Sequence, residues 1–280
     1  MPHSLPFGLA LQGLMHPLLP SLLAAFLYAG TTGYQGLRLS QRTTPDKRLL
    51  ILGGGLALLA HCTALFLELL TPAGLYLDFF NAASLIAAAV ILLTILASTR
   101  IPIENLLLLL LPLGALTALA AALVPGGTSQ AIDEAPGILA HILLSILAYG
   151  LLTMAVFQAL LLLLQDHQLK HKHPSGLIKN FPALQTMESL LFSFLWAGWS
   201  LLSLSLISGW VFVDNLFAQH LAHKTILSCI AWVVFGVLIW GRHQLGWRGH
   251  KAIRWTLAGF CLLMLAYFGS KLVREFILHV

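Results

Sequence analysis

The fold is decided by the stretch Pro136-Gly137-Ile138-Leu139-Ala140-His141-Ile142-Leu143-Leu144-Ser145-Ile146-Leu147-Ala148-Tyr149-Gly150, which stays apolar to about residue 164. A helix needs roughly 20 apolar residues to cross a hydrocarbon layer of about 30 Å, and this stretch supplies them. The whole chain is 59% hydrophobic and 9% charged, whereas soluble domains are about 25% charged. We therefore expect lipid, and not water, to surround most of the chain.

Eight apolar stretches of this kind follow one another and leave little chain for a soluble domain. They cover residues 17–37, 49–70, 79–99, 104–124, 137–164, 188–213, 224–241 and 252–274. We predict an all-α membrane protein, with residues 1–280 forming a single integral membrane domain of about eight transmembrane helices. The first stretch follows no basic region and no clear cleavage site, so we interpret it as a membrane helix and not as a removable signal.

Lysine and arginine residues are distributed unequally between the loops of this bundle. If the N-terminus lies outside, only Lys224, Lys271 and Arg274 of the 15 basic residues fall in outer segments. An excess of basic residues in inner loops is typical of membrane proteins. The pattern predicts that both termini face the periplasmic side of a bacterial inner membrane. Because the net charge of +5 follows from topology, we expect the lipid bilayer, and no nucleic acid, as a partner.

Two histidines inside apolar stretches are candidate functional residues, because ionisable groups are costly in lipid. His61 lies about 12 residues from the inner end of its stretch, roughly 18 Å deep at 1.5 Å per residue. It either hydrogen-bonds a neighbouring helix or ligates a cofactor. His141 begins the fifth stretch on the outer side, just after the acidic pair Asp133-Glu134. It is either a hydrated interface residue or an iron ligand.

Further histidines fall on the outer side. His220 and His223 are three residues apart before the seventh stretch and share a face if that segment is helical, and His279 is the penultimate residue. Haem iron accepts imidazole axially, so two histidines from different helices can hold haem b without a covalent link. We therefore take His141, His61, His279, His220 and His223 as candidate haem ligands.

The motifs that would indicate another chemistry are missing. The three cysteines are isolated from one another and lie in apolar stretches: Cys62, Cys229 and Cys261. We expect them to be small, buried hydrophobic residues. No CxxCH motif is present, which excludes covalent attachment of haem to this chain. There is no HExxH, Walker or Rossmann motif. We predict no enzymatic activity.

Several segments resemble the cytochrome c assembly proteins of the CcsA, ResC and CcmC type. The segment 137–149, with its core His-Ile-Leu-Leu-Ser-Ile-Leu-Ala-Tyr, looks like the entry of one family helix. Two further segments look like the last two helices of the family: Gly246-Trp247-Arg248-Gly249 and Ala266-Tyr267-Phe268-Gly269. His61, followed by Phe80-Asn81-Ala82-Ala83-Ser84-Leu85, is similar to an early histidine and the segment after it. The similarity covers nearly the whole chain, is strongest over 187–273, and favours the YpjD branch, which is grouped with HemX-like proteins.

The resemblance implies a multi-pass inner membrane protein that binds or handles haem and is at most an auxiliary in cytochrome c maturation. By this resemblance His141 takes the position of an outer axial ligand and His61 that of an intramembrane histidine. The second outer ligand would fall beside His279. The second intramembrane histidine would fall near Trp240-Gly241, where this chain has none.

One departure from the family keeps another function open. Haem-handling members carry a tryptophan-rich outer loop before the seventh helix, whereas residues 214–225 here contain no tryptophan but do contain Phe217, His220 and His223. A cofactor-free regulatory or scaffold subunit of the HemX-like type, acting on another membrane protein, is the alternative. A transporter is a third interpretation, but the absence of acidic residues near a midplane argues against proton coupling.

Overall fold

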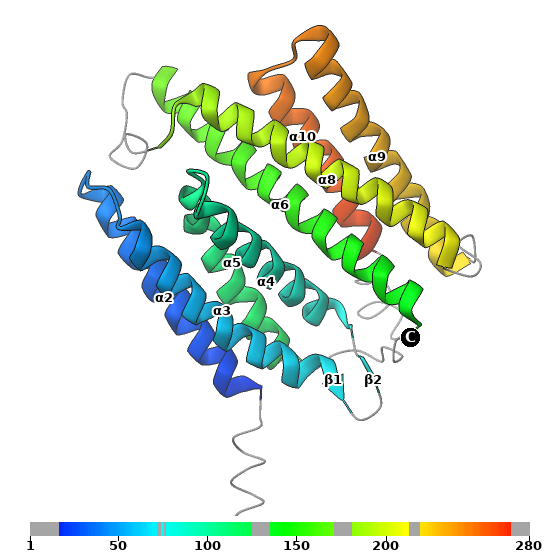
Figure 1. Cartoon of the computed structure of the whole chain (residues 1–280), viewed down its shortest axis with the longest axis horizontal. Helices are drawn as coiled ribbons and strands as arrows, with labels where there is room; N and C mark the ends of the chain where they lie inside the picture. Colours follow the sequence, from blue (N-terminus) through cyan, green and yellow to red (C-terminus); the bar gives the residue numbers. More distant parts are fainter. Residues whose placement is uncertain are drawn as a thin grey trace, which may run out of the picture.

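The computed structural model describes residues 17–71, 74–75, 77–124, 135–170, 181–212 and 219–269. These residues form eight α-helices (Figure 1): α2 (Leu18–Ser40), α3 (Lys47–Leu69), α4 (Phe79–Ser98), α5 (Leu107–Leu123), α6 (Pro136–Lys170), α8 (Leu184–Phe212), α9 (Gln219–Leu245) and α10 (Gly249–Met264). A 3-10 turn, η1 (Glu104–Leu106), precedes α5, and a π-helical turn, η2 (Leu265–Gly269), continues α10. The two-residue strands β1 (Leu70–Thr71) and β2 (Gly74–Leu75) pair antiparallel between α3 and α4.

Seven of the described helices are long and apolar enough to cross a membrane, and α2 is the exception. The described residues contain the eight predicted helices, but the ability to span a membrane is confirmed for seven of them, because α2 is more polar than the others. Its buried face carries Ser21, Tyr28, Thr31 and Gln35. Gln35, for example, donates from Nε2 to the Glu104 carbonyl oxygen at 2.8 Å. These buried polar groups of α2 therefore point at neighbouring helices and not at lipid.

The fifth helix extends further than its apolar pattern predicts. The expected inner loop 165–187 is shorter, because α6 continues to Lys170 and α8 begins at Leu184. An ion pair of 2.7 Å between Asp166 and Lys170, four residues apart, supports the added turn. With 35 residues α6 is about 52 Å long, more than a hydrocarbon layer of about 30 Å. The last turns of α6 therefore extend beyond the hydrocarbon region.

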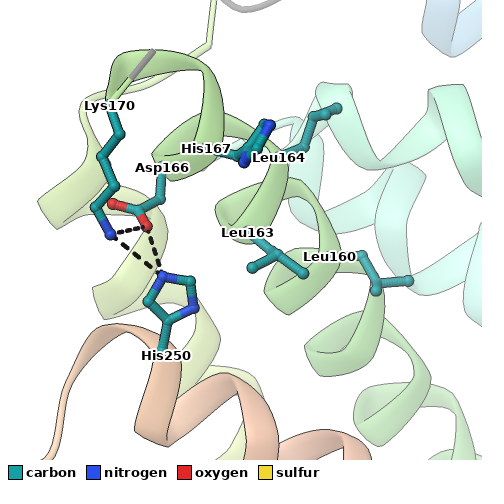
Figure 2. A pocket seen from close by; sticks show the side chains of 7 residues that line it. All are labelled: Leu160, Leu163, Leu164, Asp166, His167, Lys170 and His250. Atoms are coloured by element: carbon teal, nitrogen blue, oxygen red, sulfur yellow. Dashed lines mark hydrogen bonds and ion pairs between the residues drawn. The ribbon is translucent and has the colours of Figure 1, made fainter.

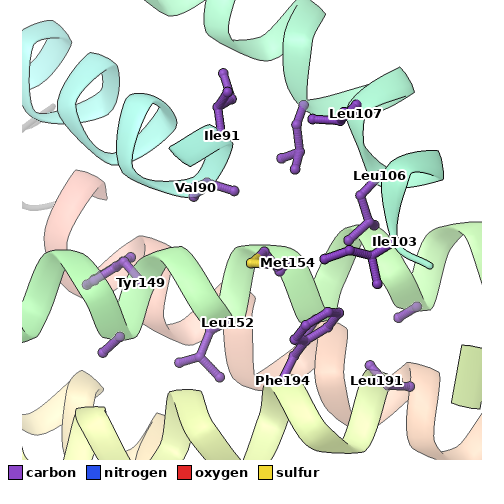
Figure 3. Close-up of a cluster of buried hydrophobic side chains, with 14 of the residues drawn as sticks. Val90, Ile91, Ile103, Leu106, Leu107, Tyr149, Leu152, Met154, Leu191 and Phe194 are labelled. Atoms are coloured by element: carbon purple, nitrogen blue, oxygen red, sulfur yellow. The ribbon is translucent and has the colours of Figure 1, made fainter. Parts of the chain in front are cut away.

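The helices pack in two groups that lie side by side (Figure 1). The first group comprises α2, α3, α4 and α5, the second comprises α6, α8, α9 and α10, and contacts between α4 and α6 join them. Figure 3 shows part of the apolar core where the groups meet, with side chains from α4, the η1–α5 segment, α6 and α8: Val90, Ile91, Ile103, Leu106, Leu107, Tyr149, Leu152, Met154, Leu191 and Phe194. Since lipid is as apolar as leucine, close packing of such side chains holds membrane helices together.

Many large apolar side chains lie outside this core, as expected of a surface in contact with lipid. Phe26 and Trp210 are each 76% exposed. The expectation that the cysteines are buried was wrong, because Cys62, Cys229 and Cys261 are all exposed and free. An apolar run shows that a residue lies in the membrane, but it does not show whether that residue faces protein or lipid.

Candidate functional site

His141 is held by the end of α8. Its Nδ1 atom lies 2.9 Å from the Ser205 carbonyl oxygen and 3.1 Å from Ser208 Oγ. A carbonyl oxygen can only accept, so Nδ1 carries a hydrogen and donates. The Ser208 hydroxyl donates to the same Ser205 carbonyl at 2.9 Å, which leaves its lone pairs available to the Nδ1 hydrogen. The neutral imidazole therefore carries its free lone pair on Nε2.

Further contacts fix the backbone and the ring plane around His141. Ser145 Oγ donates to the His141 carbonyl oxygen at 2.7 Å and lies 2.8 Å from Ser205 Oγ. Gly209 lets the ring approach α8, because a Cβ atom there would lie 3.0 Å from His141 Cε1. No described residue hydrogen-bonds Nε2. The half-buried ring is thus oriented by one nitrogen while the other stays available.

His61 has the opposite arrangement. It is fully buried, with Nδ1 3.2 Å from the Tyr28 hydroxyl of α2 and Nε2 2.8 Å from Ser84 Oγ of α4. A neutral imidazole donates through one nitrogen and accepts through the other, and both hydroxyls can take either role. His61 therefore joins α2, α3 and α4, and both of its nitrogens are engaged.

The structure does not bring the remaining candidate histidines to His141 within the described ranges. His220 and His223 both lie in α9, which begins at Gln219, so they are three residues apart on one helix as the sequence pattern anticipated. The His223 side chain is exposed, and the His220 side chain lies outside the described part. His279 lies outside the described residues altogether. No group of three His, Cys, Asp or Glu side chains in the described ranges could hold a metal ion.

Aromatic contacts connect the helices around the His141 end of the second group. Tyr149, two turns beyond His141 on α6, donates to the Leu263 carbonyl oxygen at 2.6 Å. Its ring meets Tyr267 of η2 edge-on at 6.0 Å, and Lys224 Nζ lies 5.6 Å from the Tyr267 ring centre. π-helical turns often occur at functional sites, and η2 carries one of the segments that resembles the family.

The opposite end of α6 carries an open pocket of about 470 Å³ that sequence reasoning missed (Figure 2). The Asp166 carboxylate lies 2.7 Å from Lys170 Nζ and 2.9 Å from Nε2 of His250, the second residue of α10. Leu160, Leu163, Leu164 and His167 complete the lining. The spacing of Asp166 and Lys170 was visible in the sequence, but His250 joins them only because α10 packs on α6. Such exposed ion pairs contribute little to stability.

These features define a polytopic helical membrane protein with one oriented, half-buried histidine. The profile of the family described as Cytochrome C assembly protein matches residues 49–278. The chain belongs to this family, and the resemblance seen in the sequence is confirmed.

Individual relatives agree with this assignment. The chain is 34% identical to Inner membrane protein YpjD of Escherichia coli strain K12 over 264 aligned residues. These residues cover 92% of this chain and 98% of that protein. Protein HemX of Brevibacillus brevis is 23% identical over 134 residues, 47% of this chain and 49% of that protein. Cytochrome c biogenesis protein CcsA of Prochlorococcus marinus strain NATL1A is 28% identical over 95 residues, 33% and 30% of the two chains. No solved structure matches significantly. The chain is a multi-pass inner membrane protein related to cytochrome c biogenesis factors.

Proposed function

We propose that this chain binds haem b without a covalent link, at the α6 end that carries His141, and handles it as an auxiliary in cytochrome c maturation. The orientation of the His141 ring carries the proposal. Histidines that ligate metals commonly donate a hydrogen bond from the N–H of their other ring nitrogen to a carbonyl or carboxylate oxygen, which sets the tautomer and the direction of the ring. His141 has this arrangement, with Nδ1 on the Ser205 carbonyl oxygen. His141 would hold the iron of bound haem through Nε2.

The other candidate histidines have different roles in the proposal. A second histidine that would hold haem is, in this proposal, one of His279, His220 and His223, from their predicted outer position and the family resemblance. His61 would have to give up its hydrogen bonds to Tyr28 and Ser84 before either nitrogen could meet iron. We therefore assign haem binding to His141 first and a helix-joining role to His61.

The proposal places the His141 end of α6 and both termini on the periplasmic side. It is supported by the gathering of twelve of the 15 basic residues in the opposite segments. Alkaline phosphatase, which is active only outside the cytoplasm, tests this orientation. Fusions within 125–134 should be active and fusions within 171–180 inactive. The reverse pattern would show that the chain has the opposite topology.

The visible spectrum of the purified protein tests haem binding. After expression with added haem precursor and purification in mild detergent, we expect a Soret band and reduced α-band that His141→Ala removes or strongly weakens. His243→Ala is the matched control, since His243 is exposed in the last turn of α9. Absence of a Soret band from the unaltered protein, or its full retention in His141→Ala, would count against the proposal.

A cofactor-free regulatory or scaffold subunit is the second candidate function. The lack of tryptophan in 214–225 and the internal hydrogen bonds of His61 favour it. In that case a membrane partner should copurify in mild detergent from a haem-deficient strain, equally well with His141→Ala. A partner recovered only when haem and His141 are both present would instead support haem handling.

A further inference from the structure

A second polar site lies at the end of the first helix group where α3 turns into α4. Glu68 is the next-to-last residue of α3, and both of its carboxylate oxygens are buried, with no hydrogen bond of good geometry to any residue that the structure describes. Ser21 of α2 and Asp78, which precedes α4, are the side chains that interact with this carboxyl group. No described cation forms an ion pair with Glu68, and a buried carboxylate without a counter-charge is costly, so something must compensate it.

The groups beside Glu68 are also short of partners. Ser21 is fully buried with its hydroxyl against the Glu68 carboxyl group, whereas Asn81 is 7% exposed and its Oδ1 atom has no hydrogen-bond partner among the described residues. Asn81 instead uses its donors to hold Asp78, with its backbone N–H 2.7 Å from Asp78 Oδ1 and its Nδ2 2.9 Å from Oδ2. Asp78 thereby caps α4 and is kept beside Glu68.

The unpartnered atoms are of one chemical kind. When Glu68 is ionised its two oxygens can only accept, as can Asn81 Oδ1, and Ser21 adds a hydroxyl oxygen. One proton on Glu68 would satisfy one acceptor, whereas a cation can satisfy several together. Carboxylate, amide and hydroxyl oxygens are the ligands of hard cations such as Ca²⁺, and the set contains no nitrogen or sulfur donor. Two carboxylates would balance a divalent charge.

The geometry points to a binding site for a hard divalent cation of the Ca²⁺ type, formed by Ser21, Glu68, Asp78 and Asn81. This site would lie one layer beyond the His61 hydrogen bonds. Ser21 is seven residues from Tyr28 on α2, and Glu68 is seven residues from His61 on α3, which is two helical turns or about 10 Å. Both layers involve the same three helices. A cation bound there would hold α2, α3 and α4 together at the end of the first group, as the hydrogen bonds of His61 hold them together in its interior.

Calcium-dependent stability of the full chain tests this site. The protein is purified in mild detergent, treated with chelator, and its thermal unfolding is followed by fluorescence during titration with CaCl2. We expect a saturable rise in the unfolding temperature that Glu68→Gln abolishes. Ser21→Ala should keep the rise but move it to higher Ca²⁺ concentration, by about tenfold or more, because the ligand set sets the affinity. Displacement of bound Tb³⁺ by Ca²⁺ should give the same order of affinities.

Glu104→Gln is the matched control, since Glu104 belongs to the same helix group but pairs with Lys47 at 3.9 Å. Its Ca²⁺ response should equal that of the unaltered protein. Three results would overturn the site: no response of the unaltered protein up to about 10 mM Ca²⁺, an undiminished response in Glu68→Gln, or stabilisation by acid alone that Glu68→Gln reproduces without Ca²⁺. If Glu68→Gln does not fold, an undiminished Ca²⁺ affinity in Ser21→Ala would also overturn the site.

Discussion

Removing the Ser84 hydroxyl should destabilise the first helix group, because it leaves a nitrogen of a fully buried histidine without a partner. Ser84 and His61 are both 0% exposed, and the bond between Ser84 Oγ and His61 Nε2 is 2.8 Å long. A buried polar group that loses its partner costs about 1–3 kcal/mol in soluble proteins. Hydrogen bonds between membrane helices average about 0.6 kcal/mol and reach about 1.7. We expect Ser84→Ala to lower the free energy of unfolding by about 1–2 kcal/mol.

Two further variants make the comparison specific. Tyr28→Phe removes the longer bond, 3.2 Å from the Tyr28 hydroxyl to His61 Nδ1, and should cost about 0.5–1 kcal/mol. Thr94→Ala is the matched control on α4, because Thr94 is equally buried but its hydroxyl donates to its own helix, to the Val90 carbonyl oxygen at 2.8 Å. It should cost about 0.5 kcal/mol or less, since the helix backbone bonds remain.

Reversible unfolding by added SDS in mixed micelles, followed by tryptophan fluorescence, measures these free energies. In a His61→Leu background, Ser84→Ala should cost almost nothing, which gives a coupling energy of about 1–2 kcal/mol in a double-mutant cycle. The reasoning would be refuted if Ser84→Ala and Thr94→Ala cost the same. It would also be refuted if the cost of Ser84→Ala persisted after His61→Leu.

Two other contacts lead to predictions of the same kind. Gly209→Val should push the His141 ring from α8, cost about 1–3 kcal/mol and weaken any Soret band, whereas Gly55→Val, with nothing within 4 Å, should leave the band unchanged; equal spectra would contradict the ring position. Glu188→Ala should cost about 1–3 kcal/mol in SDS unfolding, because Glu188 Oε1 accepts from Arg242 at 3.4 Å and from the amide N–H that begins α10 at 3.1 Å. A neutral result there would show that water already separates the pair.

The helical part of the fold was predictable because its signal is local. Length and apolar composition located eight helices, and most of their bounds agree with the structure to within a few residues. The clear errors have a common origin. The burial of the polar face of α2 and the exposure of Cys62 depend on which side of a helix meets protein, and hydropathy summed along a stretch does not show this.

The candidate site was predictable only in its residue types. An intramembrane histidine is costly, so His61 and His141 stood out from the sequence, and the family resemblance ranked them. The proximity of Ser21 and Asp78 to Glu68 was missed, because each residue alone is ordinary at a helix end. Only the approach of three helices makes that set unusual.

The sequence by itself therefore determines that the chain is a multi-pass helical membrane protein of the cytochrome c assembly family, because hydropathy, charge distribution and motif similarity are properties of the linear chain. Only the tertiary structure decides what the two histidines can do. The partner of His141 is 64 residues away on α8, and those of His61 are 33 and 23 residues away on α2 and α4. Hydrogen bonds leave one nitrogen available on His141 and none on His61, and such long-range contacts form only when the helices pack.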